Sequence, residues 1–283
     1  MQRDARGYHE TFRITIKLKS VDFATGNFPI RSCKMRTLVY SLLILTVCVG
    51  SIYAELPKDI VFLATFDEGK GDALTDLSGN GNDGTVDGKA DWIDGEFEKG
   101  FNFDGKTFIT VENAAPLKEL SHPMSVGAWI NPDGITNWQN IVEMDGGAGW
   151  KFGFHGSKRV VWTTYHVKDF IGQTTIAEGE WSHVAATWDG KEAIIYINGE
   201  EDDGGPIAGG GVIDVSGEPS LDIGYRRTSS SSHFIGGMDE LWVSNEVKSQ
   251  KEIQEFMNSG FNTILAVDPA HKLAVTWGKL KAN

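Results

Sequence analysis

Residues Glu180 to Glu200 read EWSHVAATWDGKEAIIYINGE, and this stretch decides the fold predicted for the chain around it. Two runs rich in β-branched and aromatic residues flank Asp189-Gly190, a dipeptide that accepts the positive φ angles of a type I′ turn. Apolar side chains alternate along both runs, as they do in strands with one buried face. The second run ends at Asn198-Gly199, which is another turn signal. The stretch therefore predicts a long antiparallel hairpin.

The order W-x-H-V-A-x-T-W-D-G followed by I-Y-I-N-G resembles the laminin-G and pentraxin-like branch of the concanavalin A-like lectin/glucanase superfamily. Other blocks carry the same resemblance, namely FDEG and DLSGNGNDGT between residues 66 and 85, FNFDG at 101–105 and IGGMDELWVSN at 235–245. The resemblance implies an all-β fold, a jelly-roll sandwich of two antiparallel sheets. Helical spacing of apolar residues adds one short C-terminal helix, from about Ser249 to Asn258.

The N-terminal 54 residues differ from the rest of the chain. Lys34 and Arg36 precede the apolar run LVYSLLILTVCV, and a small residue, Ala54, follows. This order is typical of a secretory signal peptide, and we expect cleavage after Ala54. Translation from Met35 would give a signal sequence of ordinary length, and an uncleaved signal anchor is the alternative. The predicted domains are the leader (1–54), the sandwich (55–260) and a C-terminal tail (261–283) with no assigned role.

Charge limits the partners of the exported part. The whole chain carries a net charge of −13, from 26 basic and 39 acidic residues. Removing the eight basic and three acidic residues of the leader leaves 18 and 36, a net charge of −18. Such a surface repels nucleic acids and anionic membranes. Both cysteines, Cys33 and Cys48, belong to the leader, so the sandwich has no disulfide. These features indicate a bacterial protein that is secreted, displayed at the cell surface or held in the periplasm.

Catalytic patterns are missing from the sequence. Sandwich glucanases of this superfamily place acidic residues alternately along one strand, and no predicted strand here carries E-x-D-x-E. The seven histidines are scattered, and there is no G-x-S-x-G motif. We therefore expect a binding module without enzymatic activity. The alternatives are a protein-binding adhesion domain and, less favoured, an enzyme that acts on polysaccharides.

Aromatic residues in polar surroundings are the candidates for ligand binding. Trp138 lies in TNWQN beside a turn, while Trp162 and Tyr165 lie on a run of mixed polarity near basic residues. Arg226 adds hydrogen-bond donors from the loop before the last strand. Sugars stack their C–H faces on aromatic rings and offer hydroxyls to polar groups, so these four residues predict a glycan site. A polysaccharide, a glycoprotein glycan or an extracellular protein is the expected partner.

The metal prediction follows from the resemblance. It implies that the first and last strands lie side by side, beneath the glycine-rich loop. That arrangement would bring together Asp67, Asn82, Asp83 and Asp239. Oxygen ligands of this kind suit Ca²⁺. Alternatively, Asp67 and Asp239 only accept hydrogen bonds from turn amides.

Overall fold

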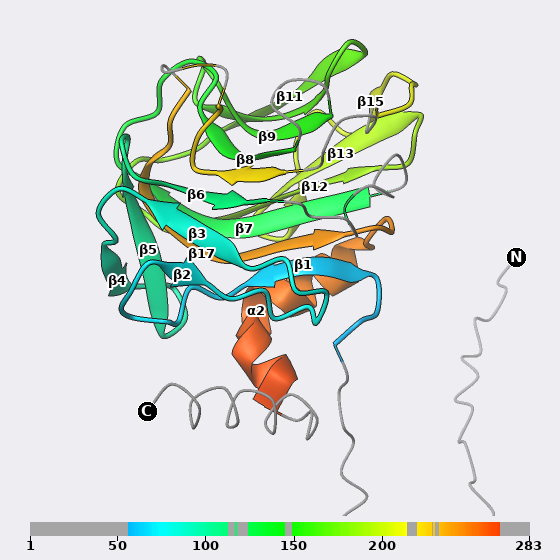
Figure 1. Cartoon of the computed structure of the whole chain (residues 1–283). Coiled ribbons are helices and arrows are strands. Elements are labelled where there is room, and N and C mark those ends of the chain that lie inside the picture. The colour runs from blue at the N-terminus through cyan, green and yellow to red at the C-terminus, as the bar shows by residue number, and fades with distance from the viewer. Residues whose placement is uncertain are drawn as a thin grey trace, which may run out of the picture. The chain divides into compact units, whose positions relative to one another are not determined.

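The computed structural model describes residues 56–112, 117, 124–144, 149–213, 220–227, 229 and 232–266 (Figure 1). The predicted leader and residues 267–283 lie outside these ranges. Two antiparallel sheets, of nine and eight strands among the described residues, pack face to face. The all-β sandwich predicted from the sequence is therefore confirmed.

The nine-stranded sheet contains, in order, β14 (Glu200–Glu201), β13 (Glu192–Ile197), β12 (Ser182–Trp188), β7 (Met124–Pro132), β17 (Ile235–Ser244), β5 (Lys99–Asp104) and β4 (Trp92–Asp94). In addition, β15 (Ile207–Ala208) pairs with β13, and β1 (Ile60–Ala64) pairs with β17. The first and last strands thus lie side by side, with Ile60 opposite Ser244, as the resemblance implied.

The eight-stranded sheet contains, in order, β11 (Lys168–Thr175), β10 (Arg159–Thr164), β9 (Trp150–His155), β8 (Asn140–Met144), β16 (Leu221–Ile223), β6 (Phe108–Val111), β3 (Gly84–Asp87) and β2 (Ala73–Leu74). Strands β8 to β11 follow one another along the chain, so this half of the sheet is a simple meander. Its turns bring residues 165–167 and 156–158 to opposite ends of the strands.

The central hairpin is confirmed, but its turn differs from the prediction. Val184 pairs with Ile197 and Trp188 pairs with Ala193. Of the dipeptide Asp189-Gly190, only Gly190 has a positive φ, 90°, so the turn is not type I′. The Asp189 carboxylate instead accepts hydrogen bonds from two backbone amides that follow it in the loop. Positive φ at both central residues occurs at the next turn, where Asn198 has 50° and Gly199 has 77°.

The main core lies between the two sheets. Its largest side chains are aromatic and alternate along the strands, as Phe152 and Phe154 do in β9, and Phe154 packs on Phe234, which in turn contacts Phe103 of β5. All of these rings are fully buried. Because neighbours in a strand point to opposite faces, Lys151 and the other residues between the core aromatics face outward.

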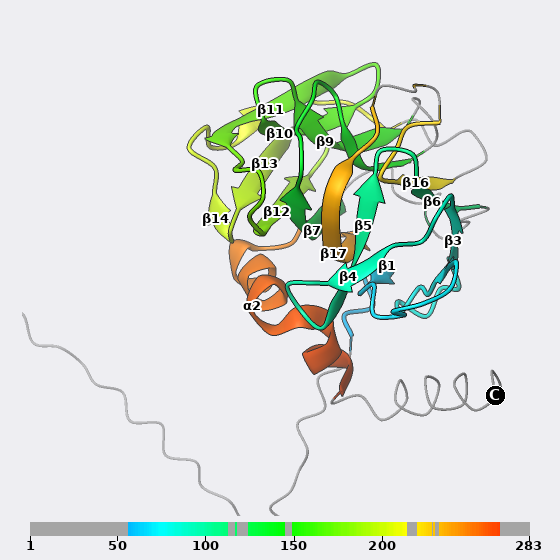
Figure 2. The same ribbon diagram turned by 90° about the vertical axis from the view of Figure 1, so that its left-hand side faces the viewer.

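Helix α2 (Gln250–Ala266) covers the outer face of the nine-stranded sheet. Ile253, Phe256 and Phe261 pack there against Trp242 and Leu63 in a second apolar cluster. Figure 2 shows α2 beginning beside β14, where Gln250 donates a hydrogen bond to the Gly199 carbonyl.

The predicted helix is correct in place but too short. The observed helix continues to Ala266 across a kink at Gly260, and so extends past residue 260, the predicted end of the sandwich domain. Ser249 caps the helix, because its backbone N–H donates to Glu252 and its hydroxyl accepts from the Glu252 amide. In the described part of the chain, no helix combines the length and apolar character needed to cross a membrane.

Candidate binding site

A row of polar side chains crosses the outer face of the eight-stranded sheet. Strand pairing sets the row residue by residue, because directly opposed residues point to the same face. Glu143 of β8 is opposite Lys151 of β9, and Lys151 is opposite Thr163 of β10. Thr163 is opposite Asp169 of β11, and on the other side Glu143 is opposite Asp222 of β16. The α2 helix packs on the other sheet, so it does not cover this row.

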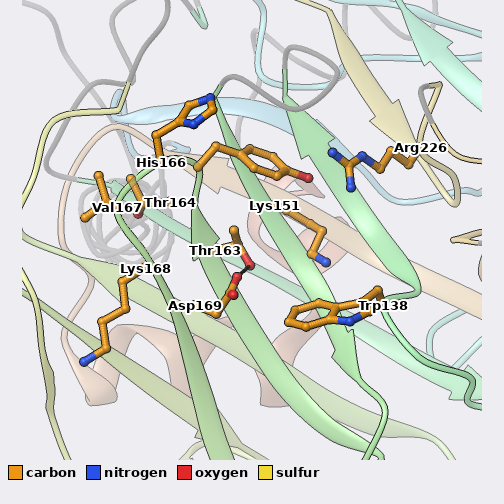
Figure 3. Close-up of a pocket in the computed structure, with 10 residues that line it drawn as sticks. Trp138, Lys151, Thr163, Thr164, His166, Val167, Lys168, Asp169 and Arg226 are labelled. Atoms are coloured by element: carbon orange, nitrogen blue, oxygen red, sulfur yellow. Dashed lines mark hydrogen bonds between the residues drawn. The ribbon is translucent and has the colours of Figure 1, made fainter.

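Loops on either side of the row enclose a pocket of about 440 Å³ (Figure 3). One wall comes from the β10–β11 turn and the start of β11, a second from the loop before β8, and a third from the loop after β16. The lining residues are Trp138, Lys151, Thr163, Thr164, Tyr165, His166, Val167, Lys168, Asp169 and Arg226. A mixed lining of one indole, one phenol and several charged groups is suited to a polar ligand with an apolar face.

Lys151 forms the floor of the pocket. The residue is only 3% exposed, and its ammonium lies 4.5 Å from the centre of the Trp138 ring. Burial lowers the pKa of Lys151 to about 8, although the nearby Glu143 and Asp169 carboxylates oppose the shift. The ammonium is therefore a desolvated cation beside an aromatic face.

Glu143 lies next to Lys151 in the row and is fully buried. Its carboxylate accepts a hydrogen bond from the Asn140 amide and lies 3.5 Å from Nε of Arg226. Burial raises the pKa of Glu143 to about 7, and the Arg226 charge acts against that rise. The Arg226 guanidinium also lies 5.1 Å from the centre of the Tyr165 ring. Glu143 thus holds Arg226 over the sheet rather than facing the pocket itself.

Asp222 repeats this arrangement one strand further on. It is fully buried, and Nε of Arg227 donates to both of its carboxylate oxygens at 3.0 and 2.8 Å. Two successive arginines after β16 therefore neutralise two successive buried acids of the row. This pairing fixes the loop that forms the third wall of the pocket.

The end of the pocket away from Arg226 carries a hydrogen-bond acceptor, the Asp169 carboxylate. Thr163 donates its hydroxyl hydrogen to Oδ1 of Asp169 at 2.7 Å, the interaction drawn in Figure 3. Nearby, Lys168 donates to the Ala208 carbonyl at 2.6 Å, so its charge is directed to the edge of the pocket.

Two lining residues have unusual backbone geometry. Trp138 has φ of 63° and His166 has φ of 61°, values in the left-handed region that is costly for residues with a Cβ. The Trp138 ring is also fixed by an edge contact with His155, at a centroid distance of 5.2 Å. Strained conformations persist where surrounding structure enforces them, and they concentrate at functional sites.

Three of the four residues predicted to bind a ligand line this one pocket. Trp138, Tyr165 and Arg226 come from three separate loops, and the fold brings them together around Lys151. Trp162 does not belong to the group, and the expectation that it presents an exposed ring is wrong. It is 1% exposed and stacks on Trp150 at 5.2 Å, because it is opposite Phe152 on the core side of the sheet.

The four residues predicted to surround a calcium ion do not form one group, although Asp67 lies near enough to Asp239 to affect its pKa. Asn82 donates to the Val61 carbonyl, and Asp83 accepts from the Asp76 amide, so both stabilise the glycine-rich loop. Asp67 and Asp239 accept hydrogen bonds from the backbone amides of Lys99 and Phe97. Within the described residues, no three His, Cys, Asp or Glu side chains form a group that could hold a metal ion.

Asp239 nevertheless has an unusual neighbour, Glu240, at a bulge in β17 where Glu240 adopts φ of 52°. Both carboxyl groups are buried, and Asp239 Oδ1 and Glu240 Oε1 have no hydrogen-bond partner among the described residues. Burial raises the pKa of Asp239 to about 8 and that of Glu240 to about 9, and the Asp67 charge adds to both shifts. Glu240 Oε2 accepts from the Phe261 amide, which connects the bulge to α2.

The sequence-based prediction missed the residues at the base of the pocket, chiefly Lys151, Thr163 and Asp169. A signal existed for Lys151, because W-K-F places one charged residue between two core aromatics of a strand. The same pattern marks Glu143 in V-E-M and Asp222 in L-D-I. Each marks the outward face of a strand that is buried on its other side.

Comparison with known proteins agrees with this architecture. The family profile described as the concanavalin A-like lectin/glucanases superfamily, of laminin-G type, matches residues 103–254. The chain belongs to this superfamily. No curated protein matches the sequence.

Solved structures with the superfamily fold include several binding domains. Domain 4 of AbnA, an extracellular GH43 arabinanase from Geobacillus stearothermophilus solved with arabinotriose, is 19% identical with a TM-score of 0.58. That match covers 71% of this chain and 98% of the domain. The binding domain of Paraclostridial Mosquitocidal Protein 1 is 20% identical with a TM-score of 0.55, over 72% of this chain and 53% of the other.

The binding domain of botulinum neurotoxin DC, solved with rat synaptotagmin II, is 14% identical with a TM-score of 0.54. Here the match covers 71% of this chain and 51% of the other. The present chain thus spans about half the length of the toxin domains. At these identities the likeness establishes a shared fold.

Proposed function

We propose that this superfamily member is a non-catalytic carbohydrate-binding module, and that the pocket around Trp138 and Lys151 is its glycan site. The observation that carries the proposal is the convergence of an indole, a phenol and charged donors from three loops on one concave surface. A sugar ring would lie against the Trp138 face, with its hydroxyls between Asp169 on one side and Arg226 on the other. The arabinotriose complex of a protein with the same fold supports this class of ligand.

The chemistry of the pocket favours binding over catalysis. Glycoside hydrolysis needs two carboxyl groups that both reach the scissile bond. Glu143 is fully buried and engaged by Asn140 and Arg226, which leaves Asp169 as the carboxylate that lines the cavity among the described residues. One accessible carboxylate can accept hydrogen bonds from hydroxyl groups but cannot supply both the acid and the nucleophile.

A protein partner is the second candidate, since a domain with this fold has been solved with synaptotagmin II. Protein interfaces usually centre on an apolar patch with aromatic anchors. Among the described residues, the exposed large hydrophobic side chains are Val212 and Val247, and neither is aromatic. The polar pocket therefore supports a glycan ligand more strongly.

A glycan array tests the proposal, with the mature protein and Trp138→Ala as probes. The parent should bind a restricted set of glycans, and Trp138→Ala should lose them. Trp181→Ala is the matched control, because Trp181 is only partly buried and lies outside the pocket. Failure of the parent to bind any glycan, or equal binding by Trp138→Ala, would reject the glycan function.

Calcium would act on stability rather than in the pocket. Ca²⁺ binds oxygen ligands, and Asp239 and Glu240 offer two buried carboxylate oxygens that lack partners. Asp67 contributes a nearby negative charge. A cation held there would remove the repulsion between these acids and would fasten the β17 bulge to α2. The melting temperature in calcium and in chelator tests this, and Asp239→Ala should abolish any difference.

Export remains part of the same proposal. A glycan-binding module serves outside the cytoplasm, and the basic and apolar composition before Ala54 supports secretion. The intact mass of protein recovered from the medium or periplasm should correspond to a chain that starts at Glu55. Recovery of the uncleaved chain from the cytoplasm would contradict export.

A further inference from the structure

We propose that the pocket selects sugars that carry a carboxylate, such as a hexuronate or a sialic acid, and that Lys151 is the residue that recognises the acid. This inference rests on the proposed glycan function and names the substrate class of that same site. It starts from the unused hydrogen-bonding capacity of one buried ammonium group.

Lys151 is almost completely buried, yet none of the described residues accepts a hydrogen bond from its ammonium. Its described contact is the face of the Trp138 ring. An ammonium group has three donors, and here they open to the cavity without an acceptor from the described residues. Figure 3 shows this ammonium directed into the cavity between Trp138 and Asp169. A ligand acceptor in the cavity would supply what the protein does not.

The acids beside Lys151 in the row are engaged elsewhere. Glu143 pairs with Arg226 and Asn140. Asp169 accepts the Thr163 hydroxyl hydrogen through Oδ1. These contacts hold the two carboxylates away from Lys151, although both are near enough to influence its pKa. A carboxylate on the ligand would therefore make the direct contact with the Lys151 ammonium that neither acid makes.

The balance of charge in the pocket also favours an anionic ligand. Among the described residues, Lys151, Lys168 and Arg226 line it with three positive charges, while Asp169 lines it and the buried Glu143 pairs with Arg226, so positive charges exceed carboxylates by one. The chain as a whole carries a net charge of −13, so this positive region contrasts with the rest of the protein. A local positive field inside an acidic protein attracts anionic groups to one place and repels them elsewhere.

Pairs of ligands that differ only in charge test the inference. Calorimetric titration would compare trigalacturonic acid with its methyl ester, and sialyllactose with the methyl ester of its sialic acid carboxyl group. At least one acid should bind about ten-fold or more tightly than its neutral counterpart, because charge-assisted hydrogen bonds exceed neutral ones. The pair that shows the difference identifies the source of the carboxylate.

Lys151→Met should reduce that ratio to near one, while the exposed Lys106→Met should leave it unchanged. Equal affinity for acid and neutral forms in the parent would overturn the inference, whether or not the variant folds. Tighter binding of neutral sugars such as arabinotriose, still abolished by Trp138→Ala, would overturn it and leave the glycan function standing. Binding of no sugar at all would overturn both.

Discussion

The ammonium of Lys151 lies 4.5 Å from the centre of the Trp138 ring, although the two residues belong to a strand and to a loop before the preceding strand. Cations are attracted to the face of an indole, and the attraction grows when both are desolvated. Lys151 therefore holds the ring at the edge of the pocket, and the ring shields the charge from water. A ligand in the cavity would contact both groups at once.

Trp138 and Trp162 should respond differently to substitution. Trp138→Ala should weaken glycan binding by about ten-fold or more, as loss of a central aromatic contact usually does. Trp162→Phe should instead lower the free energy of unfolding by about 2 kcal/mol, since the smaller ring leaves space beside Trp150. Titration calorimetry and urea unfolding of both variants separate the two effects. A loss of affinity in Trp162→Phe at unchanged stability would contradict the placement of Trp162 in the core.

Binding of an acidic sugar should weaken as pH rises. The pKa of Lys151 is lowered to about 8. The side chain therefore carries its positive charge at pH values well below about 8 and loses that charge as the pH rises through about 8. Glu143, with its pKa raised to about 7, gains a negative charge over the same range. The Asp169 and Arg226 charges also act on the ammonium, the first raising the pKa of Lys151 and the second lowering it. Affinity measured across this range should fall steadily, whereas Lys151→Met should show a weaker dependence and a neutral sugar almost none.

Stability in chelator should also fall as pH rises. Asp239 and Glu240 have pKa values raised to about 8 and about 9 in the folded protein, from ordinary values of 3.8 and 4.5. Between these limits the folded state holds more protons than the unfolded chain, so the free energy of unfolding decreases with pH. Calcium binds the ionised form and should raise the melting temperature more at about pH 8 than at about pH 5. Asp239→Asn should flatten the profile, and an identical profile in that variant would contradict the role of this pair.

The arginine that covers Asp222 should be important for folding. Arg227→Met leaves a fully buried carboxylate without its cation and should destabilise the protein by about 3 kcal/mol. Lys251→Met is the control, because its ion pair with Glu255 is exposed to solvent and should contribute much less to stability. Urea unfolding measures both. Equal, small losses would show that Asp222 is neutralised in another way.

Much of the fold could be predicted because its signals are local. Alternating apolar residues define β12 and β13, and the pairing of β1 with β17 follows from the family pattern. The turn type at Asp189 could not be predicted, because an Asp-Gly pair also suits a loop in which the Asp side chain accepts the backbone hydrogen bonds. The helix continues past Gly260 because the apolar cluster with Phe261 and Leu265 compensates for the kink.

The candidate site was predictable only in part. Trp138, Tyr165 and Arg226 stand out in the sequence as aromatic and basic residues in polar loops. For Lys151 the sequence signals only an outward-facing charge, because its place beside Trp138 depends on the register that sets it opposite Glu143 and Thr163. The prediction that Trp162 is exposed was wrong for the same reason, since its orientation also depends on strand register. Trp162 lies in a run of mixed polarity, but its place opposite Phe152 puts its ring in the core.

The indole N–H resonances of the nine tryptophans provide the most direct test that the pocket is the binding site. In protein labelled with ¹⁵N-tryptophan, the Trp138 signal is assigned by its loss in Trp138→Phe. Addition of the best ligand from the array should shift that signal and leave those of the buried Trp188 and Trp242 in place. A saturating glycan that shifts other indole signals but not that of Trp138 would contradict the account.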